Sequence, residues 1–222
     1  MVVLGLTGSI GMGKTTVANA LRATGAAVFD ADAAVHRLLG PGGEAVDVVL
    51  ARFPDAASGE GAARAVDRGA LGARVFADPE ALAALEAILH PRVRAGERRF
   101  LAASQRRGCR LAVLDIPLLF ETGGEARCDA TVVVSAPSFV QRARVLGRAR
   151  MSEERLAAIL ARQMPDAEKR RRADFVIQTG LDRRVSRLAA RRIAARLAAT
   201  RGTRWPACWA GVVRPAREDA HA

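Results

Sequence analysis

Eight consecutive residues near the start of the chain could hold a phosphate group. They are Gly8, Ser9, Ile10, Gly11, Met12, Gly13, Lys14 and Thr15, in the P-loop pattern G-x-x-x-x-G-K-[ST]. An apolar run at 2–6 predicts a buried strand before the motif, and residues 16–22 predict a helix after it. Such a loop directs backbone N–H groups and the positive end of a helix dipole toward an anion. The sequence therefore predicts a nucleoside triphosphate site.

The residue types of this motif have separate uses. Gly8 and Gly13 let the backbone wrap closely around a phosphate, and the Lys14 ammonium can reach the β- and γ-phosphates. The hydroxyl of Thr15 can ligate Mg²⁺. Lys14 is one of two lysines beside thirty-three arginines, which argues against a chance match. The predicted ATP-binding residues are Gly8, Gly11, Met12, Gly13, Lys14, Thr15 and Thr16.

Composition indicates an ordinary globular, water-soluble protein. The chain has 222 residues, of which 50% are hydrophobic and 26% charged, enough for one core with inserted lobes. The apolar run at 111–120 is interrupted by Asp115 and Pro117, and no run approaches the length of a membrane span. The three cysteines are widely spaced and fit neither a disulfide framework nor a zinc site. We expect a cytoplasmic protein, not bound to membranes, that is a monomer or a weak homo-oligomer.

The net charge of +12 allows two interpretations. One is nucleic-acid binding through a basic surface. The other is a general bias toward arginine together with a site that holds several phosphates. Arginine is spread along the chain, tyrosine is absent and aromatic residues make up only 4%, so stacking platforms for bases are missing. We expect no nucleic-acid partner.

Strand and helix patterns alternate along the chain. The predicted strands are residues 2–6, 27–29, 111–114, 131–134 and 175–177. The predicted helices are residues 13–24, 31–39, 43–53, 67–76, 79–89, 92–107, 138–148, 153–162 and 182–199. Short, continuously apolar strands are typical of a parallel sheet covered on both faces. The pattern predicts a doubly wound α/β fold of the P-loop kinase type, with five parallel strands and helices on both faces.

Two long segments interrupt this alternation inside a main domain of residues 1–200. Residues 33–110 show several helical patterns and no clear strand, which predicts an inserted helical substrate lobe. Residues 138–172 are helical and rich in arginine, which predicts a lid that excludes water during transfer. Residues 201–222 are expected to form a loosely packed tail whose tryptophans lie on the core or at an interface.

Acidic residues follow two of the predicted strands. Asp30 and Asp32 come after the second strand, where one of them is expected to cap a helix and a carboxylate could also accept the proton of an attacking hydroxyl. Asp115 ends the run at 111–114, the usual place of an acid close to Mg²⁺ in P-loop proteins.

Seven blocks of residues together resemble the dephospho-CoA kinase family. They are GLTG at 5–8, FDAD at 29–32, VFAD at 75–78, LHPRVR at 89–94, DIPLLFE at 115–121, RQMP at 162–165 and ADFVI at 173–177. Their order and spacing match the family over about residues 3–180. The resemblance implies a nucleotide-kinase-like sheet with a substrate lobe and a lid. It also implies transfer of the γ-phosphate of ATP, with Mg²⁺, to the 3′-hydroxyl of the ribose of dephospho-CoA.

The resemblance further implies roles for single residues. Asp32 would lie at the acceptor ribose as a base or orienting group. Lys14 and Arg144 would also be catalytic residues. His90 and Arg92, in the block that the family places in its substrate lobe, would bind the acceptor. Thr15 and Asp115 would hold the metal. Thr179 stands where many relatives have an asparagine after the last strand.

Three other classes of protein could explain a P-loop in this chain. Another small P-loop kinase would share the loop and sheet but would lack the blocks at 30–32, 89–91 and 117–121 together. A regulatory GTPase needs an N-K-x-D motif for guanine, and the only asparagine is Asn19, so this class is excluded. A nucleic-acid-dependent ATPase predicts turnover that nucleic acid stimulates.

Overall fold

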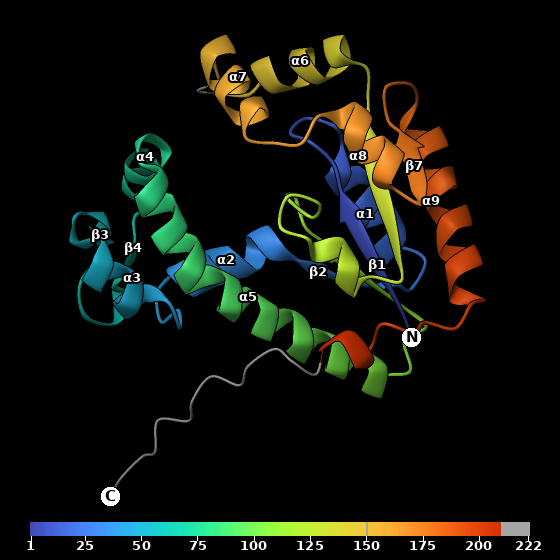
Figure 1. Ribbon diagram of the computed structural model, residues 1–222, viewed down its shortest axis with the longest axis horizontal. Helices are drawn as coiled ribbons and strands as arrows, with labels where there is room; N and C mark the ends of the chain where they lie inside the picture. Colours follow the sequence, from blue (N-terminus) through green and yellow to red (C-terminus); the bar gives the residue numbers. More distant parts are fainter. Residues whose placement is uncertain (150, 210–222) are drawn as a thin grey trace, which may run out of the picture. The chain divides into compact units, whose positions relative to one another are not determined.

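The computed structural model describes residues 1–149 and 151–209 of the chain (Figure 1). Five parallel strands form one sheet in the order β2-β5-β1-β6-β7. Their bounds are β1 Val2–Thr7, β2 Ala27–Asp30, β5 Leu111–Asp115, β6 Ala130–Ser135 and β7 Phe175–Gln178. The predicted α/β fold with five parallel strands is confirmed. Because β1 lies in the middle, the loop that follows it opens between the carboxyl ends of β5 and β6.

Helices cover both faces of this sheet. Val2, Leu4 and Leu6 of β1 belong to one buried apolar cluster, to which α1 (Lys14–Arg22) and α9 (Arg183–Ala198) contribute. Side chains alternate along a strand, so Gly5 faces the other side. A Cβ at Gly5 would lie 2.7 Å from Leu119 Cδ2, which requires glycine there. The same side receives α8 (Asp166–Arg172), which packs on β6.

The chain divides into two compact units. One contains the parallel sheet with residues 1–30 and 100–209, and the other is residues 31–99. The second unit has its own apolar core, which includes Leu38, Val49, Phe53, Leu71 and Leu85. Its helices are α2 Ala31–Leu39, α3 Val46–Arg52, α4 Arg68–Ala77 and the first part of α5 Pro79–Arg106. Short 3-10 turns lie at η1 Pro54–Ala56 and η2 Gly61–Ala63.

The second unit also contains a small hairpin that the sequence did not indicate. Strands β3 (Ala57–Ser58) and β4 (Ala65–Val66) pair antiparallel. Each has two residues, which is too short for an alternating pattern to be visible. The expectation of no strand in this region was therefore wrong.

A second correction concerns α5, which replaces the two helices predicted at 79–89 and 92–107. Pro91 lies inside one continuous helix of 28 residues. Leu85 and Leu89 before the proline, and Val93 after it, pack on the same apolar cluster. The shared packing holds the two halves in line although Pro91 cannot donate a backbone hydrogen bond. The Arg92 guanidinium donates to the carbonyl of Ile88 at 2.8 Å, one turn earlier.

The segment between β6 and β7 consists of three helices. They are α6 Ser138–Leu146, α7 Glu153–Ala161 and α8 Asp166–Arg172. Ser152 caps α7, since its hydroxyl accepts the N–H of Arg155 at 3.3 Å. Among the described helices none is both long and apolar enough to cross a membrane.

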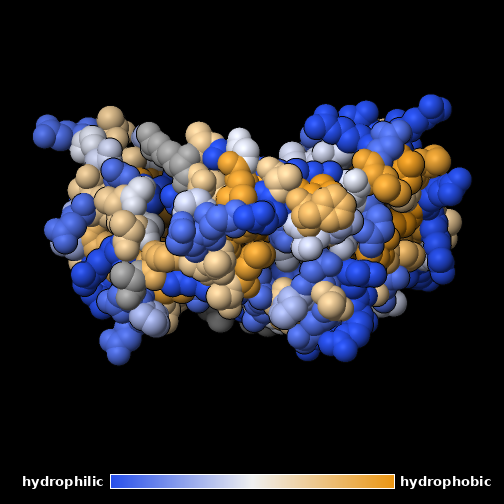
Figure 2. Space-filling view, turned by 90° about the horizontal axis from the view of Figure 1, so that it is seen from above, coloured by the Kyte–Doolittle hydropathy of each residue, from blue (hydrophilic) through white to orange (hydrophobic). Residues whose placement is uncertain are grey.

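The sequence of α9 places Val185, Leu188, Ala189, Ile193 and Leu197 on one predicted apolar face. Leu197 is buried, and Ala189 and Ile193 pack against the sheet cluster, but Val185 and Leu188 are 54% and 47% exposed. The buried positions are Ser186, Ala190, Ala194 and Leu197. Small side chains at 190 and 194 let α9 approach α1 closely, which turns the larger residues outward. Figure 2 shows separate hydrophobic patches on a surface that is mostly hydrophilic.

The described part of the tail packs on the sheet unit. A Cβ at Gly202 would lie 2.1 Å from the Met1 carbonyl oxygen, and Trp209 is only 1% exposed. The Trp205 indole N–H donates to Gln105 Oε1 at 2.6 Å. Trp209 is thus buried and Trp205 half-buried, in line with the expectation for the tryptophans, while most of residues 201–209 are exposed. Residues 210–222 lie outside the described residues.

Candidate phosphate-binding site

The loop after β1 has the close backbone approach that a phosphate cradle needs. A Cβ at Gly8 would lie 2.6 Å from the Val134 carbonyl oxygen on β6. Gly11 and Gly13 adopt φ values of +77° and +89°, which side chains disfavour. Gly13 directly precedes α1, so the backbone N–H groups of Lys14 and Thr15 are left for an anion, while that of Thr16 donates to the Gly13 carbonyl at 3.1 Å.

Lys14 lies at the mouth of this loop. Its Nζ is 2.5 Å from Asp115 Oδ1 at the end of β5, and the Asp115 side chain is 5% exposed. The strand pairing of β1 and β5 brings the two residues together across 101 positions of sequence. A cation paired with a nearly buried carboxylate is held in place for charge-assisted contacts with phosphate oxygens.

Two glutamines hold the peptide groups of Ile10 in the first half of the loop. Gln141 Nε2 on α6 donates to the Ile10 carbonyl at 2.8 Å. Gln163 Oε1, between α7 and α8, accepts the Ile10 N–H at 3.2 Å. The predicted lid segment therefore contacts the loop through two separate elements.

Arg144 and Thr179 hold the second half of the loop. The Thr179 hydroxyl donates to the Met12 carbonyl at 2.5 Å. The Arg144 guanidinium donates to the Thr179 hydroxyl at 3.1 Å and to the Thr179 carbonyl at 2.5 Å. The sequence-predicted residue Arg144 thus lies against the loop, through a threonine whose role sequence reasoning missed.

A buried ion pair lies behind Gln163. Glu121 Oε1, in the loop after β5, accepts the Met164 N–H at 2.8 Å and lies 2.9 Å from Lys169 Nζ on α8. The side chain of Lys169 is fully buried. All three of Glu121, Gln163 and Met164 belong to blocks that carried the family resemblance, but no role was predicted for them.

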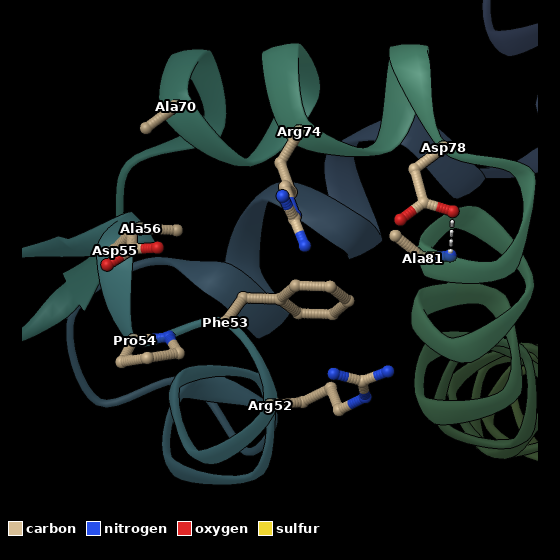
Figure 3. A pocket seen from close by; sticks show the side chains of 9 residues that line it. All are labelled: Arg52, Phe53, Pro54, Asp55, Ala56, Ala70, Arg74, Asp78 and Ala81. Atoms are coloured by element: carbon tan, nitrogen blue, oxygen red, sulfur yellow. Dashed lines mark hydrogen bonds between the residues drawn. The ribbon is translucent and has the colours of Figure 1, made fainter.

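The three residues predicted to bind the acceptor lie in the second unit. Asp32 is an exposed residue in the first turn of α2, two positions after the end of β2. His90 and Arg92 are on α5, on either side of Pro91. None of the three lines the pocket of about 220 Å³ that this unit contains, which Phe53, Arg52 and Arg74 border (Figure 3).

The donor set for Mg²⁺ is small. Among residues 1–149 and 151–209, no group of three or more His, Cys, Asp or Glu could hold a metal ion by itself. Thr15 is exposed at the start of α1, and Asp115 supplies a carboxylate from the end of β5. Mg²⁺ in phosphoryl-transfer sites is usually held by one or two protein oxygens together with substrate phosphates. The residues present therefore fit Mg²⁺ that arrives with a nucleotide.

The central strand of the parallel sheet is followed by a glycine-rich loop that contains a lysine, and arginine-bearing helices lie against this loop. Together these features define a P-loop phosphotransferase. Comparisons with known proteins identify the family within this class. The model of the dephospho-CoA kinase family matches residues 2–191. The chain belongs to the dephospho-CoA kinase family.

Its relatives cover most of its length. The dephospho-CoA kinase of Paramagnetospirillum magneticum is 60% identical over 172 residues, 77% of this chain and 78% of the relative. That of Mesorhizobium japonicum is 57% identical over 180 residues, 81% of this chain and 88% of the relative.

Solved structures agree with the fold. A Thermus thermophilus protein has a TM-score of 0.73 at 39% identity, covering 90% of this chain and 98% of that one. The dephospho-CoA kinase of Campylobacter jejuni has a TM-score of 0.66 at 25% identity, covering 88% and 96%.

Proposed function

We propose that this enzyme transfers the γ-phosphate of ATP to the 3′-hydroxyl of the ribose of dephospho-CoA and releases coenzyme A. The observation that carries this proposal is the P-loop with its Lys14–Asp115 pair, in a chain more than half identical to proteins named dephospho-CoA kinase. The transfer moves one phosphoryl group and leaves ADP.

The P-loop residues bind the donor. The backbone N–H groups of Gly11, Gly13, Lys14 and Thr15, in the loop and at the start of α1, hold the β- and γ-phosphates. The Lys14 ammonium contacts phosphate oxygens, either in place of Asp115 or together with it. It balances the negative charge that develops on these oxygens during transfer. Mg²⁺, held by Thr15 and Asp115 together with phosphate oxygens, would supply further neutralisation of this charge.

The acceptor residues are proposed from the family resemblance and their chemistry. Asp32 orients the ribose hydroxyl or accepts its proton, and His90 and Arg92 bind the rest of the acceptor. Arg144 contacts the transferring phosphate once the nucleotide is bound, since its guanidinium already lies against the loop. The substrates place this activity in the cytoplasm, and one chain as a monomer or weak homo-oligomer carries all the named residues.

The first experiment measures ADP release by the purified protein with Mg-ATP and one added acceptor. Dephospho-CoA, AMP, shikimate and single-stranded DNA are compared. Strong stimulation by dephospho-CoA alone, with coenzyme A identified by mass spectrometry, is the expected result. Stimulation by a different acceptor would keep the donor site and contradict the proposed acceptor.

The Asp32→Asn variant tests the acceptor side separately. We expect turnover to fall by about 10²-fold or more, because the group that orients or deprotonates the hydroxyl is lost. ATP affinity should stay unchanged, since Asp32 has no part in donor binding. Unchanged turnover would contradict the role of Asp32.

A further inference from the structure

Glu121 accepts a backbone hydrogen bond that fixes the chain directly beside the P-loop. Its Oε1 accepts the N–H of Met164 at 2.8 Å. Met164 follows Gln163, whose side-chain oxygen accepts the Ile10 N–H in the P-loop at 3.2 Å. The position of the Gln163 side chain on the P-loop therefore depends on the hydrogen bond between Glu121 and the N–H of the next residue, Met164.

Lys169 is the cation that keeps the Glu121 carboxylate in this place. Its Nζ lies 2.9 Å from the same Oε1, and its side chain is 0% exposed. Nζ makes no hydrogen bond of good geometry with the described residues, so charge attraction is the link between the two groups. The Glu121 side chain is 16% exposed, so without the cation it could turn toward water, where a carboxylate is better solvated.

The residue type at position 169 also indicates a specific requirement. The chain uses arginine at thirty-three positions and lysine at two, one of which is the P-loop lysine. A guanidinium carries five N–H donors in a rigid plane, whereas an ammonium is a compact point charge. The side chain at position 169 is fully buried and its charged partner is a single carboxylate, so an ammonium fits there better than a guanidinium.

We propose that Glu121 and Lys169 are positioning residues for ATP binding. Lys169 holds Glu121, Glu121 holds the Met164 N–H, and this places Gln163 on Ile10 so that the P-loop is ordered before the nucleotide arrives. A loop ordered in advance loses less conformational freedom on binding, so the gain is in ATP affinity. This assignment rests on the proposed function only in requiring that ATP binds the P-loop.

A merely structural ion pair predicts a different result. In that case any loss of ATP affinity would follow the loss of thermal stability, whatever group replaces the carboxylate. The positioning role depends instead on one acceptor atom, the oxygen that receives the Met164 N–H. Two double variants of equal charge separate these cases, because only one of them keeps that oxygen.

The test measures the Kd of Mg-ATP by calorimetry on the full-length chain, with melting temperatures recorded in parallel. Glu121→Gln with Lys169→Met keeps an acceptor oxygen on an uncharged group, which needs no cation to stay out of water, and should bind ATP within about twofold of the original chain. Glu121→Leu with Lys169→Met lacks the oxygen, and Gln163→Leu lacks the contact with the loop. Both should raise the Kd about tenfold while the proteins stay folded.

Asp174→Leu is the matched control. Asp174, between α8 and β7, also accepts a backbone N–H, that of Thr131 on β6 at 2.8 Å, but its hydrogen bonds with the described residues do not reach the P-loop. Its loss should lower the melting temperature and leave the Kd unchanged. Equal ATP affinity in the two double variants, or unchanged affinity in Gln163→Leu, would overturn the positioning role. Since the readout is ATP binding, failure of the proposed acceptor chemistry would leave this test intact.

Discussion

Glycine 11 is required both for its backbone angle and for the space around it. Its φ of +77° disfavours any side chain, and a Cβ would lie 2.5 Å from Val145 Cγ2 on α6. Gly25 has a similar φ of +87°, but nothing lies within 4 Å of its Cβ position. The two positions therefore separate backbone strain from the close approach of the loop to α6.

Gly11→Ala should weaken ATP binding at least tenfold, because the loop and α6 must move apart to accept the methyl group. Gly25→Ala should cost only about 1 kcal/mol of folding stability, the cost of the unfavourable φ. Titration of Mg-ATP into both proteins gives the comparison. Equal affinities would show that the contact with α6 does not shape the loop.

Lys14→Ala should abolish transfer, with a fall in kcat of about 10³-fold or more, because it removes a charge aimed at the phosphates. It also leaves the Asp115 carboxylate, 4% exposed, without its cation. A thermal melt followed by circular dichroism shows whether the protein is folded under the assay conditions. Substantial activity in the folded variant would contradict the assignment of the donor site.

The donor-site residues could be predicted because they are contiguous. The P-loop motif gives all of them in one stretch, and Asp115 follows from its place at the end of an apolar run. Thr179, Gln163 and Glu121 act through contacts between residues far apart in the sequence. The separations are 167 positions for Thr179–Met12, 153 for Gln163–Ile10 and 43 for Glu121–Met164. No local pattern marks such contacts, since they arise only when the sheet and helices are assembled.

Thr179, directly after β7, connects that strand to the loop after β1. Its hydroxyl donates to the Met12 carbonyl and accepts from Arg144, while its N–H donates to the Ser135 carbonyl at 2.8 Å. One residue thus joins the ends of β6 and β7 to the P-loop and to α6. The arrangement makes β7 part of the site although it is an edge strand of the sheet.

Thr179→Val should lower the free energy of unfolding by about 1–3 kcal/mol, since it leaves the buried Met12 carbonyl without its hydroxyl donor. It should also weaken ATP binding, because Arg144 loses one of its acceptors. Thr24→Val is the control, because the Thr24 hydroxyl, two residues after α1, donates to the Leu21 carbonyl at the end of that helix. Denaturant unfolding of both variants measures the difference; equal losses would assign no special role to Thr179.

Periodicity predicted the existence of most helices but not their packing. The proline in α5 suggested two helices, because the sequence does not reveal that both halves pack on one core. On α9 the prediction was wrong at Val185 and Leu188, which are exposed, because close packing against α1 places Ala190 and Ala194 inward, whereas Leu197 is buried as predicted. The central strands β1, β5 and β6 were predicted well because they are buried on both faces and continuously apolar.

The tail returns to the amino-terminal strand through Asp129. Its carboxylate accepts the N–H groups of Val3, Thr203 and Arg204 at 2.6–2.9 Å and the hydroxyl of Thr203 at 3.2 Å. Burial raises the pKa of Asp129, but these hydrogen bonds outweigh it and hold the pKa below its ordinary value of 3.8. The tail beyond α9 is therefore attached to the sheet by a charged group.

This attachment should depend on pH. Because the pKa is lower in the folded state, the stabilisation is complete above about pH 3.8 and is lost as the pH falls below it. The only tryptophans, Trp205 and Trp209, lie in the tail, so their fluorescence reports its release. We expect a red shift on acidification below this pH that precedes the loss of far-ultraviolet circular dichroism.

Asp129→Asn is the control for this titration. An amide does not ionise in this range, so the early fluorescence step should disappear and only global unfolding should remain. A step of unchanged midpoint in this variant would assign the pH dependence to another group.

The scarcity of lysine gives this protein an unusual chemical selectivity. Lys14 has a side chain that is 19% exposed, and Lys169 has none of its side chain exposed. An acylating reagent that attacks primary amines can therefore reach Lys14 and the α-amino group of Met1, but not Lys169 while the protein is folded. Bound nucleotide would prevent the mass increase on Lys14. The fraction of chains left unlabelled at Lys14 would then equal the fraction of occupied P-loops.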